Sequence, residues 1–482
     1  MGNSLNLQPA NVFRFFEEMC QIPHGSGNTK AISDYCVNFA KERNLEYHQD
    51  DVNNVIIIKE ASKGYENSEP IIIQGHLDMV CEKDAGCTKD MDTEGLDLYV
   101  DGDFLRAKGT TLGGDDGIAV AYALALLDME ELEHPRLEAV FTVDEETSMG
   151  GVQALDLSPL KGHMVLNIDS DEEGVFLTSS AGGAEVSVDL PVKRVSSQGR
   201  VCKITVDGLV GGHSGSEIHK QRANSCKIMG RVLKALAEEV SFGLAQLTGG
   251  TKHNAIARSA EACIVLEEKD LAQAKEIIAS IQNVLKSEYR VADPDLCIRF
   301  TEEGTETLQV VDPTGLTKIL FLLREYPFGV MYMSTDIEGL VETSCNVGII
   351  NLNEDMFTTC LSIRSSVATR KYEVLDRITF LGEFLGASVE KTDDYPAWEF
   401  NPNSKVRTMI ADVYRDLFHT EPRIEAIHAG LECGYLDEKM PGLDAVSFGP
   451  ANFDIHTPQE RLSISSTQRY WDLLVEFLKR AK

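Results

Sequence analysis

The sequence contains few basic residues for its length. Lys and Arg together number 45 among 482 residues, against 77 Asp and Glu, so the formal net charge is −32 at pH 7. A surface of this sign repels the phosphates of nucleic acids and of anionic lipids. No apolar run reaches the length of a membrane-spanning helix. We therefore expect neither nucleic acid nor a membrane as a partner, and we expect most of the acids to form a solvated surface.

The sequence also lacks closely spaced cysteine pairs. Its eleven cysteines are scattered and odd in number, and none forms a CxxC motif. This pattern is typical of free thiols in a reducing compartment rather than of a disulfide framework. The N-terminal residues contain neither the basic segment nor the apolar segment of a secretory signal. These features predict a cytoplasmic protein.

Alternating strand-like and helix-like segments fill the first 185 residues. Four short segments rich in Val and Ile end in polar turns, as strands do. They are NVIIIKE (54–60), PIIIQGHLD (70–78), LEAVFTVDEE (137–146) and HMVLNIDS (163–170). An apolar helix pattern covers 117–132. Buried strands that alternate with helices predict an α/β domain with a mainly parallel sheet and helices on both faces.

The pattern changes near residue 186. The segments AEVSVDLPVKRV and RVCKITVDGL alternate with a period of two, as half-exposed antiparallel strands do. A helix pattern follows at 271–289, and the α/β pattern returns after a loop-like segment at 393–404. We therefore predict a first domain in two parts, 1–186 and 399–482, with an α+β domain inserted at 187–398.

Acidic residues and histidines stand where the predicted strands end. His76 and Asp78 point to the same face of their strand, so the carboxylate can orient the imidazole. Asp115 follows two glycines at the start of a helix, and Glu145 and Glu146 leave a strand together. Each motif alone also fits a simpler role, namely a capped strand end, a helix N-cap or a solvated turn.

Two further positions complete a possible metal site. Asp169 ends another strand, and His456 lies in a loop beside a proline, where a surface His is the simpler interpretation. Two His and several carboxylates form a ligand set that suits Zn²⁺, Co²⁺ or Mn²⁺ better than Ca²⁺. Five such ligands, one of them bridging, predict two divalent ions about 3.5–4 Å apart.

The order of these motifs resembles that of a known family. HLD, GGDDG, DEE, NID and a late His follow one another as in the M20 metallopeptidases with two metal ions. Several longer stretches resemble the aminoacyl-histidine dipeptidase branch, also called Xaa-His or β-alanyl-histidine dipeptidases, and the likeness extends over essentially the whole chain. These stretches are LQPANVFRFFEEMCQIPHGSGN, GHLDMVCEK, GTTLGGDDGIAVA, GGHSGSEIHKQRANS and AIHAGLECG.

The resemblance implies a role for each residue of the possible site. Two divalent ions, most often Zn²⁺, are expected. The expected ligands are His76 and Asp169 for one ion, Glu146 and His456 for the other, and Asp115 as the bridge. Glu145 would be the general base that activates the attacking water, and Asp78 would orient His76.

The inserted domain resembles the lid of the same family. His213 would stabilise the oxyanion of the tetrahedral intermediate, a role that needs a preorganised donor. Asn254 and Arg364 would bind the substrate, since a guanidinium can bond both oxygens of a terminal carboxylate. Gly430 would form part of the substrate pocket. A turn Asn and a surface Arg are the simpler interpretations of Asn254 and Arg364.

The activity implied by the resemblance is the hydrolysis of unblocked dipeptides by a homodimer. A C-terminal His would be preferred, as in β-alanyl-histidine, and a metal-bound water would attack the peptide bond. A tripeptidase, a carboxypeptidase or an N-acyl amino-acid deacylase of the same family is the alternative. A non-catalytic binding protein that kept the fold is the third possibility, but the presence of every expected ligand and of Glu145 argues against it.

Overall fold

The computed structural model describes residues 5–482 and divides into two compact units. Unit 1 comprises Met1–Ser179, Phe400–Ala426 and Leu431–Lys482, and unit 2 comprises Ser180–Glu399 and Ile427–Gly430. The first boundary lies at 179/180, where the sequence pattern suggested 186/187. The short segment 427–430 belongs to unit 2 although the chain around it belongs to unit 1. Within residues 5–482, no helix is long and apolar enough to cross a membrane.

Unit 1 contains an eight-stranded sheet in the order β1-β2-β6-β3-β7-β21-β8-β20. The strands are β1 Glu46–Gln49, β2 Val55–Lys59, β6 Leu137–Thr142, β3 Ile71–His76, β7 Met164–Asn167, β21 Asp444–Ser447, β8 Val175–Ser180 and β20 Arg423–Ile427. The central strands β6, β3, β7 and β21 are parallel to one another, whereas β2 pairs antiparallel with β1 and β6, and β8 pairs antiparallel with β21. The predicted α/β class is confirmed, with the parallel pairing concentrated in the middle of the sheet.

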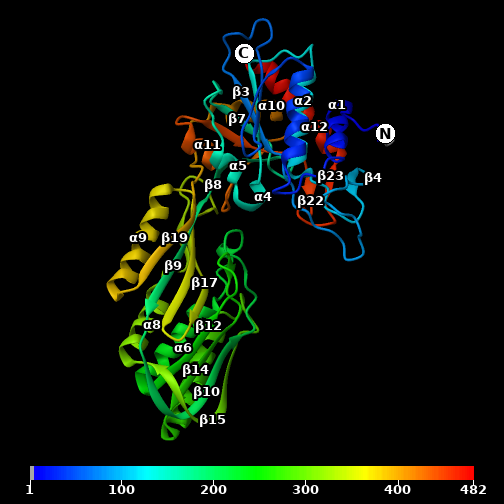
Figure 1. Cartoon of the computed structure of the whole chain (residues 1–482). Helices are drawn as coiled ribbons and strands as arrows, with labels where there is room; N and C mark the ends of the chain where they lie inside the picture. Colours follow the sequence, from blue (N-terminus) through cyan, green and yellow to red (C-terminus); the bar gives the residue numbers. More distant parts are fainter. Residues whose placement is uncertain (1–4) are drawn as a thin grey trace. The chain divides into compact units, whose positions relative to one another are not determined.

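Helices cover both faces of this sheet. They are α1 Ala10–Met19, α2 Lys30–Glu42, α3 Gly114–Asp128, α4 Glu145–Ser148, α5 Gly150–Ala154, α10 Lys405–Phe418, α11 Cys433–Lys439 and α12 Ile464–Arg480. Consecutive strand residues such as Ile56 and Ile57, which point to opposite faces, are both buried, as expected for a sheet covered on both sides. Figure 1 shows α5 and α11 on the other side of the strands from α1, α2 and α12.

Helix α3 is buried around its whole circumference. Its apolar run predicts a helix over 117–132, but α3 begins three residues earlier and ends at Asp128. Met129 is already extended, with φ −73° and ψ 119°, so the last turn of the predicted helix does not form. The early start places Asp115 and Asp116 in the first turn of α3, where both have non-helical backbone angles.

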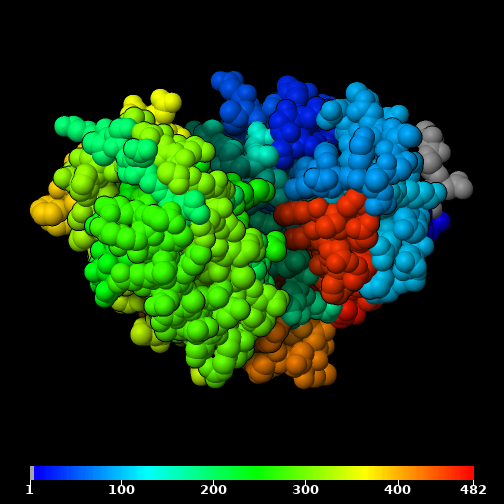
Figure 2. Space-filling view, turned by 90° about the horizontal axis from the view of Figure 1, so that it is seen from below, coloured from blue at the N-terminus to red at the C-terminus, as the bar shows by residue number. Residues whose placement is uncertain are grey.

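A small four-stranded sheet in unit 1 carries the segment around His456. Its order is β22-β23-β5-β4, with β22 Asn452–Phe453, β23 Arg461–Ser463, β5 Phe104–Ala107 and β4 Leu98–Asp101. His456 lies in the connection between β22 and β23. In Figure 2 this red-orange segment lies at the surface beside the light-blue residues of β4 and β5.

Unit 2 is built on a nine-stranded sheet in which every ladder is antiparallel. The strands are β15 Cys297–Val311, β10 Arg194–Asp207, β14 Ala260–Leu266, β12 Phe242–Gly249, β17 Val341–Leu352, β18 Met356–Ser365, β9 Gly182–Pro191 and β19 Ser388–Tyr395, with β16 Gly329–Met333 beside β17. The α-helices are α6 Ser225–Glu239, α7 Leu271–Glu288, α8 Pro313–Glu325 and α9 Ala368–Leu385. The α+β architecture and the helix predicted at 271–289 are thus both observed.

Alternation along the strands of unit 2 places its core on one face of the sheet. Cys202, Ile204 and Val206 of β10 belong to the main apolar core, together with residues of the helices. Val201 of the same strand belongs instead to a small cluster of four buried residues. Successive strand residues point to opposite faces, so one face packs on helices and the other is largely open, as in many antiparallel sheets.

Candidate metal centre

The carboxyl ends of the parallel strands bring the predicted ligands of unit 1 together. His76 is the last residue of β3, Glu145 and Glu146 begin α4 just after β6, and Asp169 follows β7 by two residues. β3, β6 and β7 are neighbours in the sheet, so these side chains meet at one edge, as ligand sites of parallel sheets do. Asp115 reaches the same point from the first turn of α3.

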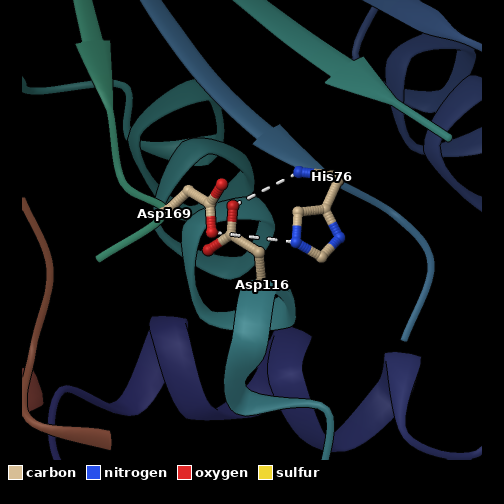
Figure 3. Close-up of side chains that lie close together, drawn as sticks. All are labelled: His76, Asp116 and Asp169. Carbon is tan, nitrogen blue, oxygen red and sulfur yellow. Dashed lines mark hydrogen bonds and ion pairs between the residues drawn. The ribbon is translucent and has the colours of Figure 1, made fainter. Parts of the chain in front are cut away.

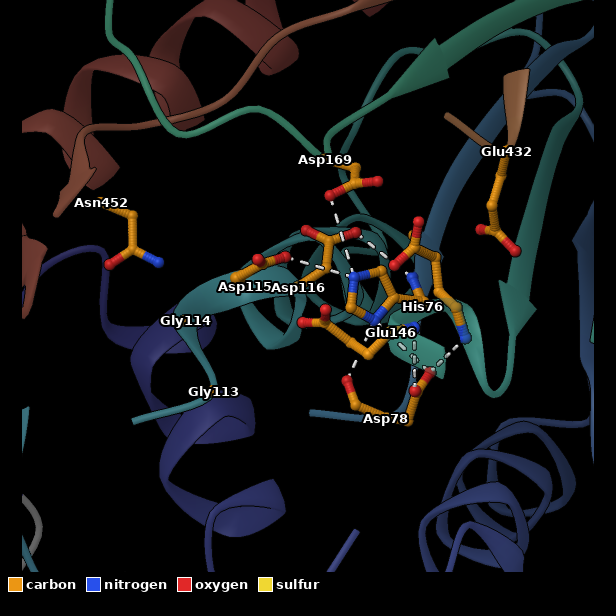
Figure 4. Close-up of polar contacts among 12 residues, drawn as sticks. His76, Asp78, Gly113, Gly114, Asp115, Asp116, Glu146, Asp169, Glu432 and Asn452 are labelled. Atoms are coloured by element: carbon orange, nitrogen blue, oxygen red, sulfur yellow. Dashed lines mark hydrogen bonds and ion pairs between the residues drawn. The ribbon is translucent and has the colours of Figure 1, made fainter. Parts of the chain in front are cut away.

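Asp115 lies between the two histidines. Its Oδ1 is 3.2 Å from His76 Nε2, and its Oδ2 is 3.1 Å from His456 Nε2. His76 Nε2 is also 3.8 Å from Asp169 Oδ1, and His456 Nε2 is 3.0 Å from Glu146 Oε1. One carboxylate therefore joins a donor group around His76 to a second donor group around His456, as a bridging ligand would. Figure 4 shows Asp115 beside His76 and Asp169.

The spacing of the donor atoms fits divalent cations. Ligand atoms of His76, Asp115 and Glu146 lie within 4.8 Å of one another, and so do those of His76, Asp116 and Asp169. Figure 3 shows Asp116 and Asp169 turned towards the His76 ring. Imidazole nitrogens and carboxylate oxygens at this spacing form a donor set suited to Zn²⁺ and similar ions.

The electrostatics of the protein alone show an excess of negative charge at this point. Burial raises the pKa of Asp169 well above its usual range, and the charge of Asp116 adds to the effect. Burial opposes protonation of His76, but its interactions with Asp115 and Asp78 outweigh burial and raise the pKa of its imidazole well above the usual value. Hydrogen bonds to the carboxylates of Asp115 and Glu146 raise the pKa of His456 to about 10. Without a cation, protons must neutralise the cluster, so its residues fit positively charged ligands well.

Asp78 fixes the turn that carries the two glutamates. Its Oδ1 accepts a hydrogen bond from the Glu145 N–H at 3.1 Å, and its Oδ2 accepts from Ser26 Oγ at 2.7 Å and from the Glu146 N–H at 3.4 Å. His76 Nδ1 is 3.0 Å from the backbone carbonyl of Asp78 and 3.6 Å from its carboxylate. Asp78 thus holds His76 mainly through its main chain, while its carboxylate orients Glu145 and Glu146.

We expect Asp78→Asn to weaken metal binding. One carboxylate oxygen becomes an amide N–H₂, which cannot accept the hydrogen bonds now made there. Loss of such supporting bonds lowers metal affinity by about 10–100-fold. Calorimetric titration of the metal-free protein with Zn²⁺ measures this. Asp156→Asn is the matched control, because Asp156 also accepts bonds from a Ser hydroxyl and a backbone N–H but lies in an exposed turn. Unchanged affinity in Asp78→Asn would contradict the role of its carboxylate.

Three buried acids beside the centre were not among the predicted site residues. Asp116 Oδ2 accepts the His76 N–H at 3.2 Å. Glu432 Oε2 accepts from Gln74 Nε2 and from Thr142 Oγ1, both at 2.6 Å, beneath the ends of β3 and β6. Glu460 accepts bonds from the turn before α3. Asp116 lies in the GGDDG motif beside Asp115, Glu432 lies in the stretch AIHAGLECG, and Glu460 follows His456 by four residues. Proximity to the predicted residues and motifs was the signal that could have identified them.

The predicted substrate-binding residues all belong to unit 2. His213 of the short strand β11 Gly212–His213 pairs with β13 Ala255–Ile256, and the Ser214 N–H donates to Asn254 O at 2.9 Å. A Cβ on Gly215 would lie 3.0 Å from His213 Cε1 and 3.2 Å from Arg364 Nε, so His213 and Arg364 flank the same glycine.

A cavity of about 890 Å³ within unit 2 is lined by His213 and Asn254. Gly430 lies in the segment 427–430. In this segment the Ala429 carbonyl accepts a hydrogen bond from the Ala181 N–H at 2.9 Å. The structure thus brings His213, Asn254 and Arg364 close to one another. Their contacts with a substrate stay predictions.

Comparison with known proteins agrees with this geometry. Residues 72–480 match the model of peptidase family M20/M25/M40. The chain is 36% identical over 481 residues to the cytosol non-specific dipeptidase of Escherichia coli, covering 99% of both chains. It superposes on the crystal structure of an aminoacylhistidine dipeptidase from Vibrio alginolyticus with a TM-score of 0.94 and 35% identity, covering 98% of this chain and 97% of the other. A Bacillus cereus aminopeptidase PepT shares the fold at 14% identity and a TM-score of 0.57, covering 98% and 99% of the two chains. The chain belongs to peptidase family M20/M25/M40.

Proposed function

We propose that this chain is a dipeptidase that needs two divalent ions and hydrolyses unblocked dipeptides, preferentially those with a C-terminal His, such as β-alanyl-histidine. The position of Asp115 between two His-containing donor groups is the observation that carries the proposal. The names of the Escherichia coli and Vibrio alginolyticus relatives, a dipeptidase and an aminoacylhistidine dipeptidase, support the substrate class.

The proposed ligands follow the two donor groups. His76, Asp115 and Asp169 would hold one ion, and Asp115, Glu146 and His456 would hold the other. Zn²⁺ fits this set of nitrogen and oxygen ligands, and Co²⁺ or Mn²⁺ could replace it. When bound, such a pair of ions polarises the scissile carbonyl and makes water a strong nucleophile near neutral pH.

Glu145 is the proposed general base. It begins the same turn as the ligand Glu146, and Asp78 fixes its backbone N–H. A carboxylate held beside the attacking water can take up its proton and pass that proton to the leaving amine. Glu145 is thus placed next to the donor set without being one of the five proposed ligands.

Arg364 is the residue proposed to bind the substrate carboxylate. Its Nη1 donates to Tyr395 Oη at 3.0 Å, while its buried Nε has no hydrogen-bond partner among residues 5–482. A guanidinium with an unused N–H can still donate to an anionic oxygen. Asn254 and Gly430 are proposed as further substrate contacts, and His213 as the donor to the oxyanion.

Location and assembly complete the proposal. A cytoplasmic location is supported by the eleven cysteines, all of which have free thiols, and by the cytosolic relative from Escherichia coli. Assembly as a homodimer is proposed from the family resemblance.

A substrate panel tests the proposed activity. We expect cleavage of β-alanyl-histidine and weaker cleavage of glycyl-leucine, loss of both after EDTA, recovery with Zn²⁺ or Mn²⁺, and no cleavage of an N-acetyl amino acid. Free amines released from each substrate measure the rates. Cleavage of only the blocked substrate would identify a deacylase, preferred cleavage of tripeptides a tripeptidase, and no metal-dependent hydrolysis a binding protein.

A further inference from the structure

The Glu460 carboxylate accepts hydrogen bonds from four consecutive backbone N–H groups. Oε2 accepts from Leu112 at 2.7 Å and from Gly113 at 3.0 Å, and Oε1 accepts from Gly114 at 2.8 Å and from Asp115 at 3.3 Å. Glu460 is only 2% exposed. We call residues 112–115 the Asp115 turn. Because all four groups are donors, the turn accommodates an anionic acceptor, and both carboxylate oxygens are in use.

The same glutamate also belongs to the segment that carries His456. Glu460 follows His456 by four residues in the connection between β22 and β23, and Asn452 of β22 donates from Nδ2 to Glu460 Oε1 at 3.1 Å. The two segments approach very closely, since a Cβ on Gly114 would lie 2.8 Å from Asn452 Nδ2. Figure 4 shows Asn452 beside Gly114 and Asp115. Glu460 therefore ties the Asp115 turn to the segment of His456.

We propose that Glu460 is a positioning residue that sets the distance between Asp115 and His456. The inference rests on the metal centre of the proposed function and assigns to that centre a residue outside its ligand set. His456 Nε2 lies 3.1 Å from Asp115 Oδ2, yet the two residues are 341 positions apart and come from different sheets and helices. Glu460 contacts the backbone of the Asp115 turn and also belongs to the β22–β23 connection that carries His456, so it links the two segments at the backbone.

The proposal predicts a larger effect on one ion than on the other. The His76 donor group also contains Asp115, but His76 and Asp169 are delivered by β3 and β7, which pair directly in the main sheet. The His456 donor group depends on the β22–β23 connection. Loss of the Glu460 contacts therefore weakens the ion of Asp115, Glu146 and His456 more than the ion of His76, Asp115 and Asp169, which keeps two ligands held by the main sheet.

Glu460→Gln is the test, with Glu138→Gln as its matched control. A Gln keeps the shape but turns one acceptor into an N–H₂ group, which faces backbone N–H groups and repels them. Glu138 is also fully buried, and it accepts from the Lys161 and Gly162 N–H groups and from Arg136 Nε. Glu138 lies in β6 at the end of the strand away from Glu145, so its loss perturbs folding without reaching the centre.

The metal-free proteins are titrated with Zn²⁺ in a calorimeter, and their circular dichroism checks folding. We expect wild type and Glu138→Gln to bind two ions, and Glu460→Gln to bind one ion with a small loss of affinity and the second about 10–100-fold more weakly. Two ions bound with wild-type affinities in Glu460→Gln would overturn the proposal, and so would equal weakening of both ions, which indicates a general structural role.

Two further outcomes are decided in the same experiment. If Glu460→Gln does not fold, Glu460→Asp replaces it, because the shorter side chain keeps the charge but cannot reach all four N–H groups. Selective weakening of one ion in Glu460→Asp supports the proposal, and wild-type affinities for both ions overturn it. If wild type itself binds fewer than two ions, the two-metal centre of the proposed function is wrong and the role of Glu460 falls with it.

Discussion

Glu145→Gln is expected to lower kcat by about 10²–10⁴-fold while leaving two metal ions bound, because a positioned general base contributes that much to a rate. The amide has the same size as the carboxylate but cannot take up the proton of water. Burial, reinforced by the charges of Glu432 and Glu146, raises the pKa of Glu145 to about 8. Steady-state kinetics with β-alanyl-histidine and elemental analysis of bound metal measure the two effects.

Glu172→Gln provides the matched control for this variant. Glu172 lies at the same edge of the sheet, three residues after Asp169, but is exposed and pairs with Arg423 at the surface. Exposed pairs contribute little, so its kcat should stay near that of wild type. If Glu145→Gln turns over as fast as wild type, the base assignment is wrong. If it loses metal, Glu145 acts as a ligand.

Asp115→Asn is expected to abolish most of the activity through loss of metal. The amide nitrogen cannot act as the second oxygen ligand, so at least one ion should be lost. Two ions contribute several kcal/mol of charge stabilisation, so the rate should fall by about a thousandfold or more. Zn²⁺ titration gives the stoichiometry, and the dipeptide assay gives the rate.

Asp116→Asn discriminates between the two neighbouring acids. Asp116 also lies near His76 and Asp169, but its Oδ2 already accepts the His76 N–H, and an Asn oxygen can keep that bond. We expect this variant to retain two ions. If Asp116→Asn loses an ion and Asp115→Asn retains both, the bridge is Asp116.

The ligands that follow strands could be predicted from the sequence, because short residue patterns show where a strand ends. The run IIIQGHLD marks a buried strand followed by polar residues, and parallel strands bring their carboxyl ends to one edge. This reasoning correctly placed His76, Glu146 and Asp169 at the edges of neighbouring strands. It also identified the two architectures, since periodicity is a local property.

The remaining part depends on contacts between distant segments. The bonds of Glu460 to the Asp115 turn span about 345 positions, and those of Glu432 to Gln74 and Thr142 span 358 and 290. No local pattern encodes such pairings. The assignment of segment 427–430 to unit 2 is likewise a tertiary feature. So is the antiparallel pairing of β2 with β6, since the sequence of β2 resembles those of the parallel strands.

The division of unit 1 between distant parts of the chain has a consequence for biosynthesis. Strand β21, with residues 444–447, inserts between β7 and β8, and His456 follows this strand along the chain. A nascent chain that emerges from its N-terminus can complete most of unit 2 before β21 has been translated. The complete metal centre therefore cannot form until residue 456 has been translated, so a chain terminated before residue 444 lacks both a central strand and a ligand.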